Sequence, residues 1–514
     1  MNVVFRTDAS TTIGTGHVMR CLTLASALHD RGVDASFICR DHDNHLCDLI
    51  EEQGFNVSRL PAAKAETQTL DTSTHAAWLG VSWQKDAEQT RVAIESMSGQ
   101  PDWLVVDHYA LDKRWEGALR KTVGRIMVID DLADRPHDCD LLLDQNLVAH
   151  MQTRYSDRVP DTCYRLLGSE YVLMQPIYAE LHHRMLPREG PIRRIFVFFG
   201  GADSNNLTER ALAAFLELKR PDIEIDVVIP EGSPHAKAIR MQTGEQGNIH
   251  LYSVLPTLAP LMAEADLAIG AGGATSWERL CLGLPTLVVT LAENQRAIAA
   301  ELHQRGLIFW IGHHDVVDES KMVEALGGLI QKGLDENWSR RCLAIIDGRG
   351  VNRVCSALTL TPATHLRVRN ASPADEAQLL DWANDPATRK NSFSQENIDP
   401  ATHRIWFHRC LRDPDACRLY IVETNEGVAV GQVRFERKDL AWEVDYALAP
   451  VFRGRGIGRP LLEAALLEIH SIEPGGMVMG QVKNCNHPSR KVFESLDFEV
   501  QSKTGEAVVY SRLL

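Results

Sequence analysis

The sequence predicts an α/β protein built from two doubly wound parallel-sheet lobes and a smaller α+β domain. Short apolar runs alternate with helical patterns from residue 2 to about 168 and again from residue 195, as in parallel sheets covered by helices. In both regions a glycine-rich turn joins a strand to a helix. After residue 415 the pattern changes to successive strands joined by short turns, which is typical of an antiparallel sheet. At about 150 residues per domain, the 514 residues suggest three domains, which we expect at 1–188, 189–355 and 366–514.

Charge and composition favour a cytoplasmic protein that acts on small molecules. The formal net charge is −15, and no concentrated basic stripe offsets it, so we expect no nucleic-acid partner. The 11 cysteines have no C-x-x-C or zinc-like spacing, and the polar stretch 41–45 lacks ligand spacing, so we expect reduced thiols and no metal. The chain enters a strand at once and has no apolar run near 18 residues, which predicts neither export nor a membrane span.

The first lobe is predicted from five apolar strands and one glycine-rich turn. The strands are expected at residues 2–6, 33–39, 103–107, 126–131 and 141–143. The turn that follows the first strand carries Gly14, Gly16, His17 and Arg20. Free backbone N–H groups at such a turn suit a phosphate or a sugar that bears one. The glycine spacing matches neither the dinucleotide fingerprint nor the P-loop, so neither NAD nor ATP is indicated.

His17 is the candidate general base of this lobe. Charged residues of both signs are expected around the same turn, where they would orient the imidazole and grip a substrate: Arg6, Asp8 and Arg20. Asp107 and Tyr109 follow a later strand, and the carboxyl ends of parallel strands meet at one crevice. A packed histidine and turn-capping carboxylates are the structural alternative, which the sequence leaves open.

The second lobe is expected to follow a proline-flanked charged stretch at residues 185–191. A strand at 195–199 runs into Gly200 and Gly201, and further strands are expected at 267–269 and 286–290. Candidate ligand residues follow these two strands: Gly273, Thr275, Ser276, Glu278, Asn294 and Gln295. Glycine amides can hold a diphosphate, while Glu278 is placed to accept both hydroxyls of a ribose. Tight turns and a solvated carboxylate are the structural alternative.

Residues 1 to about 350 resemble the glycosyltransferase-B architecture of two Rossmann-like lobes, and more closely the UDP-sugar hydrolases of pseudaminic acid biosynthesis. The resemblance rests on Gly14-x-Gly16-His17-x-x-Arg20, on residues 106–109, 129–133 and 200–203, on Gly272-Gly273-x-Thr275-x-x-Glu278, and on Asn294-Gln295. Those enzymes release 2,4-diacetamido-2,4,6-trideoxy-L-altrose from UDP. The resemblance implies that His17 is the base and that the second lobe binds UDP, with Glu278 on the ribose. It also implies that Asn294 and Gln295 lie near the diphosphate or the sugar.

The third domain is predicted to begin after a weakly patterned stretch at 351–365, in which residues 358–364 are expected to form a linker. Strands are expected at 419–423, 429–436 and 442–448. A glycine-rich loop then opens a helix, and its residues are Arg453, Gly454, Arg455, Gly456, Ile457 and Gly458. Successive amides in such a loop can wrap a pyrophosphate.

Residues 366–514 resemble the GNAT N-acetyltransferases, through this loop and through a stretch at 484–498 that is similar to the last helix and strand of that family. The resemblance implies acetyl-CoA as co-substrate, bound by the loop and by Asn486. This sequence departs from the family pattern at Phe493, where many members have a tyrosine that reprotonates the CoA thiolate. Glu443 and Asp445 are candidate bases for a sugar ammonium, and Tyr446 falls on the opposite strand face.

The two resemblances together imply a bifunctional enzyme of pseudaminic acid biosynthesis. It would N-acetylate the 4-amino group of a UDP-linked sugar with acetyl-CoA, and it would hydrolyse the diacetamido product by water attack at the anomeric carbon, with inversion. Three alternatives stay open. The first two lobes would transfer the sugar to an acceptor, the third domain would acetylate a protein, or the first two lobes would be a nucleotide-sugar sensor that controls the acetyltransferase.

Overall fold

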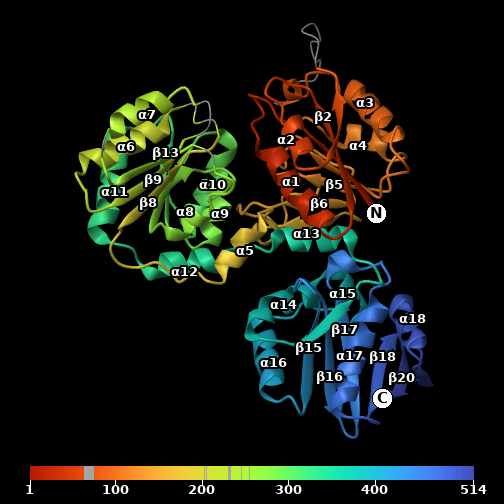
Figure 1. Ribbon diagram of the computed structural model, residues 1–514. Helices are drawn as coiled ribbons and strands as arrows, with labels where there is room; N and C mark the ends of the chain where they lie inside the picture. The colour runs from red at the N-terminus through yellow and green to blue at the C-terminus, as the bar shows by residue number, and fades with distance from the viewer. Residues whose placement is uncertain (63–74, 202, 204, 230–232, 245, 254) are drawn as a thin grey trace. The chain divides into compact units, whose positions relative to one another are not determined.

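The computed structural model describes residues 1–62, 75–201, 203, 205–229, 233–244, 246–253 and 255–514. The chain divides into two compact units, Met1–Cys355 and Ser356–Leu514. The first unit contains two parallel sheets with helices on their faces, and the second contains one mostly antiparallel sheet (Figure 1). This is the predicted fold class of two doubly wound lobes followed by an α+β domain.

The first lobe is a seven-stranded parallel sheet with the order β3-β2-β1-β4-β5-β6-β7. Its strands are β1 (Asn2–Thr7), β2 (Asp34–Arg40), β3 (Asn56–Leu60), β4 (Trp103–Asp107), β5 (Arg125–Ile129), β6 (Leu141–Asp144) and β7 (Tyr164–Leu167). Its helices are α1 (Gly16–His29), α2 (Cys47–Glu52), η1 (Ala76–Leu79), α3 (Trp83–Glu95), α4 (Lys113–Leu119) and η2 (Ser169–Tyr171). Thr7 of β1 pairs with Asp107 of β4, so the turn after β1 and the end of β4 meet at one edge of the sheet.

The second lobe is a six-stranded parallel sheet with the order β10-β9-β8-β11-β12-β13. Its strands are β8 (Arg194–Phe198), β9 (Glu224–Val228), β10 (Ile249–Tyr252), β11 (Leu267–Ala271), β12 (Thr286–Thr290) and β13 (Phe309–His313). Its helices are α6 (Leu207–Glu217), α7 (Ala236–Thr243), α8 (Ala259–Glu264), α9 (Thr275–Cys281), α10 (Glu293–Gln304), α11 (Glu319–Lys332) and α12 (Glu336–Ile345).

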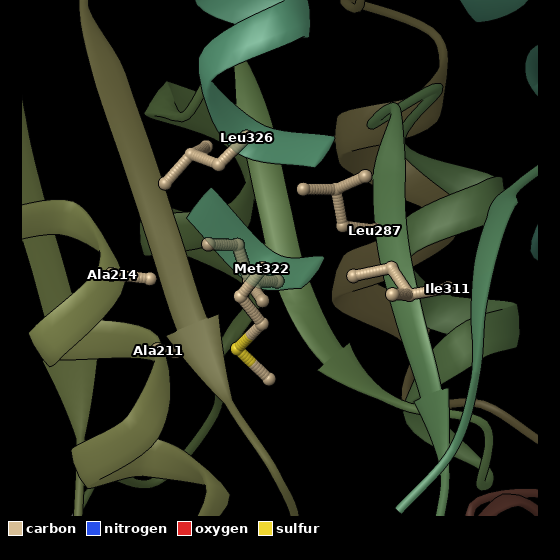
Figure 2. A pocket seen from close by; sticks show the side chains of 7 residues that line it. Ala211, Ala214, Leu287, Ile311, Met322 and Leu326 are labelled. Carbon is tan, nitrogen blue, oxygen red and sulfur yellow. The ribbon is translucent and has the colours of Figure 1, made fainter. Parts of the chain in front are cut away.

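Apolar side chains of α6 and α11 pack on this second sheet. Figure 2 shows the contact, which is lined by Ala211, Ala214, Leu287, Ile311, Met322 and Leu326. The remaining gap between these side chains is too narrow for a water molecule. It is therefore a packed core and not a ligand pocket.

Two helices cross between the lobes. Helix α5 (Pro176–His182) follows the strands of the first lobe, yet it packs on α8 and α9 of the second. Helix α13 (Gly350–Thr359) returns to the first lobe, where Arg353 Nη1 donates a hydrogen bond of 2.9 Å to the carbonyl oxygen of Glu170. The stretch 351–365 was described as weakly patterned, with a linker at 358–364, but α13 occupies its first part. Val351, Val354 and Leu358 of this helix recur at helical spacing and are buried.

The second unit is a seven-stranded sheet with the order β14-β15-β16-β17-β18-β20-β19. Its strands are β14 (Leu366–Asn370), β15 (Cys417–Thr424), β16 (Ala429–Lys438), β17 (Ala441–Leu448), β18 (Met477–Lys483), β19 (Glu499–Lys503) and β20 (Ala507–Leu513). Its helices are η3 (Pro373–Asp375), α14 (Glu376–Asn384), α15 (Pro386–Asn391), α16 (Pro400–Arg412), η4 (Pro450–Phe452), α17 (Gly458–Ile472) and α18 (His487–Ser495). The parallel strands β17 and β18 pair only at residues 441–443 and 477–479, so they part halfway along their length.

Within the described ranges, no helix combines the length and the apolar character that crossing a membrane would require.

Candidate active sites

His17 lies in the first turn of α1 and is paired with the aspartate that ends β4. Its Nδ1 atom is 2.6 Å from Asp107 Oδ1, and the His17 residue is 7% exposed while Asp107 is fully buried. Because an ionised carboxylate only accepts hydrogen bonds, Nδ1 must carry the proton in the neutral ring. The lone pair is therefore on Nε2, which is the form of the imidazole that can accept a proton from water.

Arg20, one turn further along α1, holds the carboxylate that orients His17. Its Nε and Nη2 atoms donate to the two oxygens of Asp107, each at 2.6 Å. Burial opposes ionisation of Asp107, but the charge of Arg20 and the hydrogen bonds from Arg20 and His17 outweigh it and hold the pKa of Asp107 well below its usual value. Asp107 was predicted to contact the substrate. The structure instead places its buried side chain behind His17 as an orienting group.

Aromatic rings pack next to the imidazole of His17. The ring centroids of His17 and Tyr109 are 4.6 Å apart, edge to face, and Trp78 stacks on Tyr109 at 5.5 Å. His75 packs on Trp78 at 4.6 Å. The sequence predicted a role for Tyr109 but missed His75 and Trp78, whose only signal is two aromatic side chains one turn apart beside a polar stretch. Together the rings form an apolar wall next to His17.

Arg6 and Asp8 do not take part in this arrangement, contrary to the prediction that they surround His17. Both are fully buried. Arg6 donates to Asp8 and Asp86, each at 2.6 Å, and Asp86 also pairs with Arg40 at 2.6 Å. A side chain with no exposed surface cannot contact a substrate, so the group is a buried ion-pair network beneath the strand ends.

Replacing Asp86 with alanine is expected to destabilise the protein by about 3–5 kcal/mol, because it removes the carboxylate that pairs with the buried charge of Arg40 and one of the two that pair with Arg6. Chemical denaturation followed by circular dichroism measures the loss. The matched control is Glu88→Ala on the same helix, since the Glu88 side chain is 53% exposed and its removal should change stability by less than about 0.5 kcal/mol. Equal effects of the two substitutions would contradict the structural role of the network.

A glycine turn follows β11 in the second lobe, as predicted, whereas the polar residues 292–295 after β12 lie at the start of a helix. Glu293 begins α10, and Gln295 Oε1 accepts a 2.8 Å hydrogen bond from the backbone nitrogen of Leu291. A Cβ added at Gly273 would lie 3.7 Å from Gln295 Nε2. The structure therefore brings Gly273 and Gln295 together, while Asn294 is exposed at the start of α10.

The remaining candidates of this lobe differ in their access to a ligand. Ser276, a predicted substrate contact, is buried, and its hydroxyl donates to the carbonyl oxygen of Ala271 at 3.3 Å. Thr275 is half-buried at the start of α9. After β8, Gly200 has a φ of +95° and Gly201 is exposed, whereas Ala202 of the same motif lies outside the described residues.

Glu278 is the carboxylate of this lobe best suited to a ligand hydroxyl. Its Oε2 atom is buried without a hydrogen-bond partner among the described residues. Burial raises the pKa of Glu278 to about 7, although a hydrogen bond from Tyr178 and the charge of Arg279 oppose the shift. An unpartnered buried oxygen is costly, and a ribose hydroxyl would satisfy it.

The glycine loop of the second unit has the backbone expected of an anion cradle. Gly454 and Gly456 have φ values of +72° and +76°, the left-handed region in which successive amides of anion-binding loops turn to one side. Ile457 is buried, and Gly458 begins α17. The loop ends where β17 and β18 part, since Tyr446 of β17 lies 3.8 Å from a Cβ added at Gly458.

The two arginines of the loop bind protein groups, although both were predicted to bind the cofactor. Arg453 pairs with Asp385 and donates to Thr388 Oγ1 at 2.8 Å, and Arg455 donates to the carbonyl oxygen of Ala357 at 2.6 Å. Anion contacts by this loop would therefore come mainly from its backbone amides. Asn486 caps α18 by accepting a hydrogen bond from the backbone nitrogen of Ser489 at 3.2 Å.

The structure separates the two predicted bases of this unit. Glu443 lies where β17 still pairs with β18, and it forms an ion pair with Lys438. Asp445 lies beyond the parting and is open to solvent, yet the surrounding protein desolvates it enough to raise its pKa. Asp445 is therefore the better-placed base. Tyr446 faces the other way, as predicted, and its hydroxyl donates to Ser489 Oγ at 3.1 Å.

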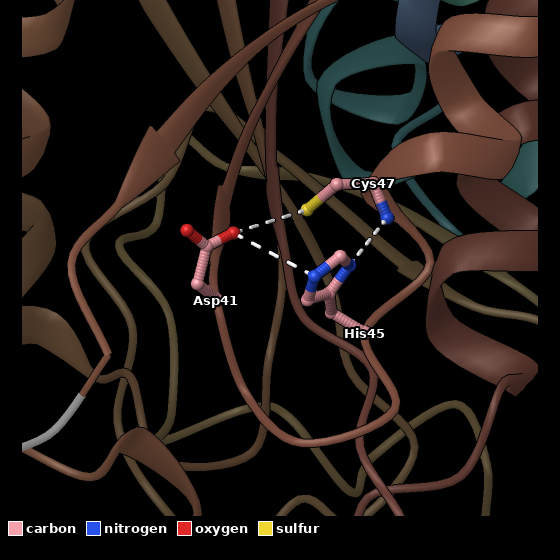
Figure 3. Close-up of side chains that lie close together, drawn as sticks. All are labelled: Asp41, His45 and Cys47. Atoms are coloured by element: carbon pink, nitrogen blue, oxygen red, sulfur yellow. Dashed lines mark hydrogen bonds and ion pairs between the residues drawn. The ribbon is translucent and has the colours of Figure 1, made fainter.

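One group of side chains in the first lobe has the residue types of a metal site (Figure 3). Asp41 Oδ1 lies 3.9 Å from His45 Nε2 and 4.0 Å from Cys47 Sγ. However, His45 Nδ1 accepts a 3.2 Å hydrogen bond from the backbone nitrogen of Cys47, so Nε2 carries the proton in the neutral ring. A metal on Nε2 would move this proton to Nδ1 and break the hydrogen bond from Cys47. The three side chains are better explained as part of the hydrogen bonding at the start of α2.

Comparisons with known proteins match different parts of the chain to different families. Residues 365–499 match the family model for the acetyltransferase (GNAT) domain, and residues 194–342 match that for the glycosyltransferase family 28 C-terminal domain. The crystal structure of Acinetobacter baumannii MurG has a TM-score of 0.48 and 17% identity, over 70% of this chain and 99% of that one.

Two curated relatives extend these matches. An uncharacterized protein of Methanocaldococcus jannaschii is 24% identical over 98% of both chains. The UDP-2,4-diacetamido-2,4,6-trideoxy-β-L-altropyranose hydrolase of Campylobacter jejuni is 25% identical over 60% of this chain and 97% of its own length. The chain therefore joins a segment similar to a UDP-diacetamido-trideoxy-altropyranose hydrolase to a C-terminal segment that matches the acetyltransferase (GNAT) domain model.

Proposed function

We propose that the protein catalyses two consecutive steps of pseudaminic acid biosynthesis. The second unit transfers acetyl from acetyl-CoA to the 4-amino group of a UDP-linked 4,6-dideoxy-N-acetyl-L-altrosamine. The first unit hydrolyses the resulting UDP-2,4-diacetamido-2,4,6-trideoxy-L-altrose to the free sugar and UDP. The observation that carries the hydrolase assignment is the His17 and Asp107 pair, which presents an imidazole lone pair next to an aromatic wall.

In the hydrolytic step, His17 acts as general base. Nε2 takes a proton from water as the water oxygen forms a bond to the anomeric carbon, and the bond between that carbon and the UDP oxygen breaks. Asp107 stabilises the imidazolium that forms. Attack from the face opposite UDP inverts the anomeric centre. UDP is a good leaving group, so amides and positive charge can stabilise it without a strong acid.

The second lobe is proposed to hold UDP. Gly273 and Gln295 lie together and would contact the diphosphate or the sugar, and the unpartnered oxygen of Glu278 would accept ribose hydroxyls. Asn294 and Thr275 stand at the starts of α10 and α9 and would extend this contact surface.

UDP affinity is expected to fall as the pH drops through about 7, because the carboxylate of Glu278, whose pKa is about 7, is protonated and loses its acceptor charge. Between about pH 8 and pH 6 the Kd for UDP should rise by about 5- to 10-fold in calorimetric titrations. Glu278→Gln is the control, because it cannot titrate. At high pH the Kd of this variant for UDP should be higher than that of the wild type, and it should change little across this pH range. A wild-type Kd that is equally flat would contradict the role of Glu278.

The second unit is proposed to bind acetyl-CoA with its glycine loop, whose left-handed Gly454 and Gly456 suit a pyrophosphate. Acetyl-CoA supplies the acetyl thioester. In the transfer the amine nitrogen forms a bond to the acetyl carbon and the carbon–sulfur bond breaks. Asp445 takes the proton that the amine loses, directly or through water, and the thiol of CoA is protonated from solvent. Phe493 is buried in the core and has no hydroxyl to contribute.

The test is turnover by the full chain without any sugar acceptor. Incubation with acetyl-CoA and the UDP-linked 4-amino sugar should give CoA, UDP and a free diacetamido sugar, as seen by mass spectrometry. UDP release that requires an added acceptor would favour a glycosyltransferase, which the family 28 match also makes worth testing. An unchanged amine, with acetylation of peptides instead, would reject the sugar as the acceptor.

A further inference from the structure

Two arginines of β16 stack on tryptophan rings, but only one of them donates hydrogen bonds to a carboxylate. Arg437 lies 4.1 Å from the ring centroid of Trp442 and forms an ion pair with Glu473. Arg434 lies 5.3 Å from the ring centroid of Trp406 on α16. Within the described part of the chain, Arg434 makes no hydrogen bond, and its Nε atom is buried without a partner. Its guanidinium is therefore held in place while its N–H groups remain without a hydrogen-bond acceptor from the described residues.

Carboxylates lie near Arg434, but none of those described accepts a hydrogen bond from its guanidinium. The Glu436 carboxylate forms an ion pair with Arg434 at 3.9 Å from Nε, which is beyond hydrogen-bond distance. Asp445 faces Arg434 directly across the antiparallel strands β16 and β17, and the two interact only through their charges. The Arg434 side chain is 27% exposed and Asp445 is open to solvent, so a ligand can reach both groups from the same face.

We infer that this face recognises an amine and a phosphate of the same molecule, with Asp445 on the amine and Arg434 on the phosphate. A guanidinium presents paired N–H donors that fit phosphate oxygens, and stacking on Trp406 fixes their direction. Directly opposed residues of neighbouring strands have Cβ atoms about 5 Å apart, a separation that one pyranose ring between an amine and a glycosyl phosphate can bridge. The acceptor class is thus a nucleotide-linked amino sugar.

This inference rests on the proposed acetyl transfer and narrows it. A lysine side chain or a polyamine brings a positive charge to Asp445 but no anion to Arg434, which would repel it. The same holds for an amino sugar that has lost its nucleotide. Arg434 would therefore make the enzyme acetylate the sugar before UDP is released.

The test compares two acceptors with the full chain: the UDP-linked 4-amino sugar and the same amino sugar with a free anomeric hydroxyl. Thiol release from acetyl-CoA reports the transfer and is not affected by later hydrolysis. For the wild type, KM for the nucleotide-linked sugar should be at least about tenfold lower. Arg434→Gln should raise that KM by about tenfold or more, with kcat within about twofold, and should leave KM for the free sugar unchanged.

A binding measurement gives a second readout that does not depend on turnover. Calorimetric titration of the UDP-linked 4-amino sugar, without acetyl-CoA, should show two sites per wild-type chain, and Arg434→Gln should raise the Kd of one of the two by about tenfold or more. Arg434→Lys keeps the charge but loses the paired donors, so it should give an intermediate KM. Arg437→Gln is the matched control, because Arg437 stacks on Trp442 of the same sheet but is already paired with Glu473.

The outcomes separate this inference from the function on which it rests. Equal use of the two sugars by the wild type would overturn phosphate recognition while leaving sugar acetylation intact. So would an Arg434→Gln variant that raises both KM values equally or lowers only kcat, since either result indicates a structural role. Transfer to neither sugar would reject the proposed acetyl transfer itself, and the inference with it.

Discussion

Replacing His17 with glutamine is expected to lower kcat for UDP-sugar hydrolysis by about 10²- to 10⁴-fold, the usual contribution of a positioned general base. The amide of glutamine keeps the polarity and much of the volume of the side chain but cannot take a proton from water. The Kd for UDP should change by less than about twofold, because the nucleotide is proposed to lie on the second lobe. Coupled detection of UDP measures kcat, and calorimetry measures the Kd.

The matched control for this substitution lies on the same helix. His29, at the other end of α1, is exposed, and His29→Gln should leave kcat within about twofold of wild type. A His17→Gln variant that retains more than about a third of the activity would contradict the general-base role. A large loss of UDP affinity in that variant would instead indicate that His17 binds the nucleotide.

Replacing Asp107 with asparagine should lower kcat by about 10²-fold or more, although Asp107 is buried and does not face the substrate. The amide can offer an N–H group to Nδ1, which would place the ring proton on Nε2 and remove the acceptor that water needs. It also removes the charge that stabilises the imidazolium. The measurement is kcat at several pH values, on protein whose folding has been checked by thermal denaturation.

Asp131 provides the comparison for Asp107. Its carboxylate contacts Arg20 Nη1 at 3.2 Å, but no hydrogen bond joins it to the imidazole in the described structure. Asp131→Asn should therefore reduce kcat by less than about tenfold, since Arg20 keeps both of its bonds to Asp107. If the two substitutions reduce kcat equally, the effect comes from the loss of a negative charge near His17 and not from a change in the tautomer of its ring.

The sequence was a good guide to the sheets because parallel strands buried on both faces are continuous apolar runs. Trp103–Asp107 and Thr286–Thr290 form β4 and β12 with the predicted bounds, and each of the five residues in both strands is buried. Helix α13 was missed, even though its apolar residues recur at helical spacing. The stretch was interpreted as weakly patterned, whereas its apolar residues are buried in the structure.

The site was harder to predict because the ion-pair partners of its residues lie far away in the sequence. Arg6 and Asp8 are close to His17 in the chain, yet their bonds go to each other and to Asp86, 80 residues away from Arg6. The partner of His17 is Asp107, 90 residues away. Parallel topology placed Asp107 at the correct edge of the sheet, but only the side-chain geometry distinguishes a residue that orients the base from one that binds substrate.

Glycines and arginines of the anion loops show the same limit. The sequence identified Gly454 and Gly456, whose left-handed backbone requires glycine. It also assigned Arg453 and Arg455 to the ligand, whereas both side chains bind protein groups. No sequence motif marks Arg434, because only the structure shows that its guanidinium lacks a hydrogen-bond acceptor among the described residues.

The most direct test of the account is hydrolysis of UDP-2,4-diacetamido-2,4,6-trideoxy-L-altrose in water enriched in oxygen-18. If His17 activates water for attack at the anomeric carbon, one heavy oxygen will appear in the released sugar and none in UDP, and the first-formed sugar will have the inverted anomeric configuration. Heavy oxygen in UDP, with none in the sugar, would place the attack at phosphorus and contradict the proposed role of His17.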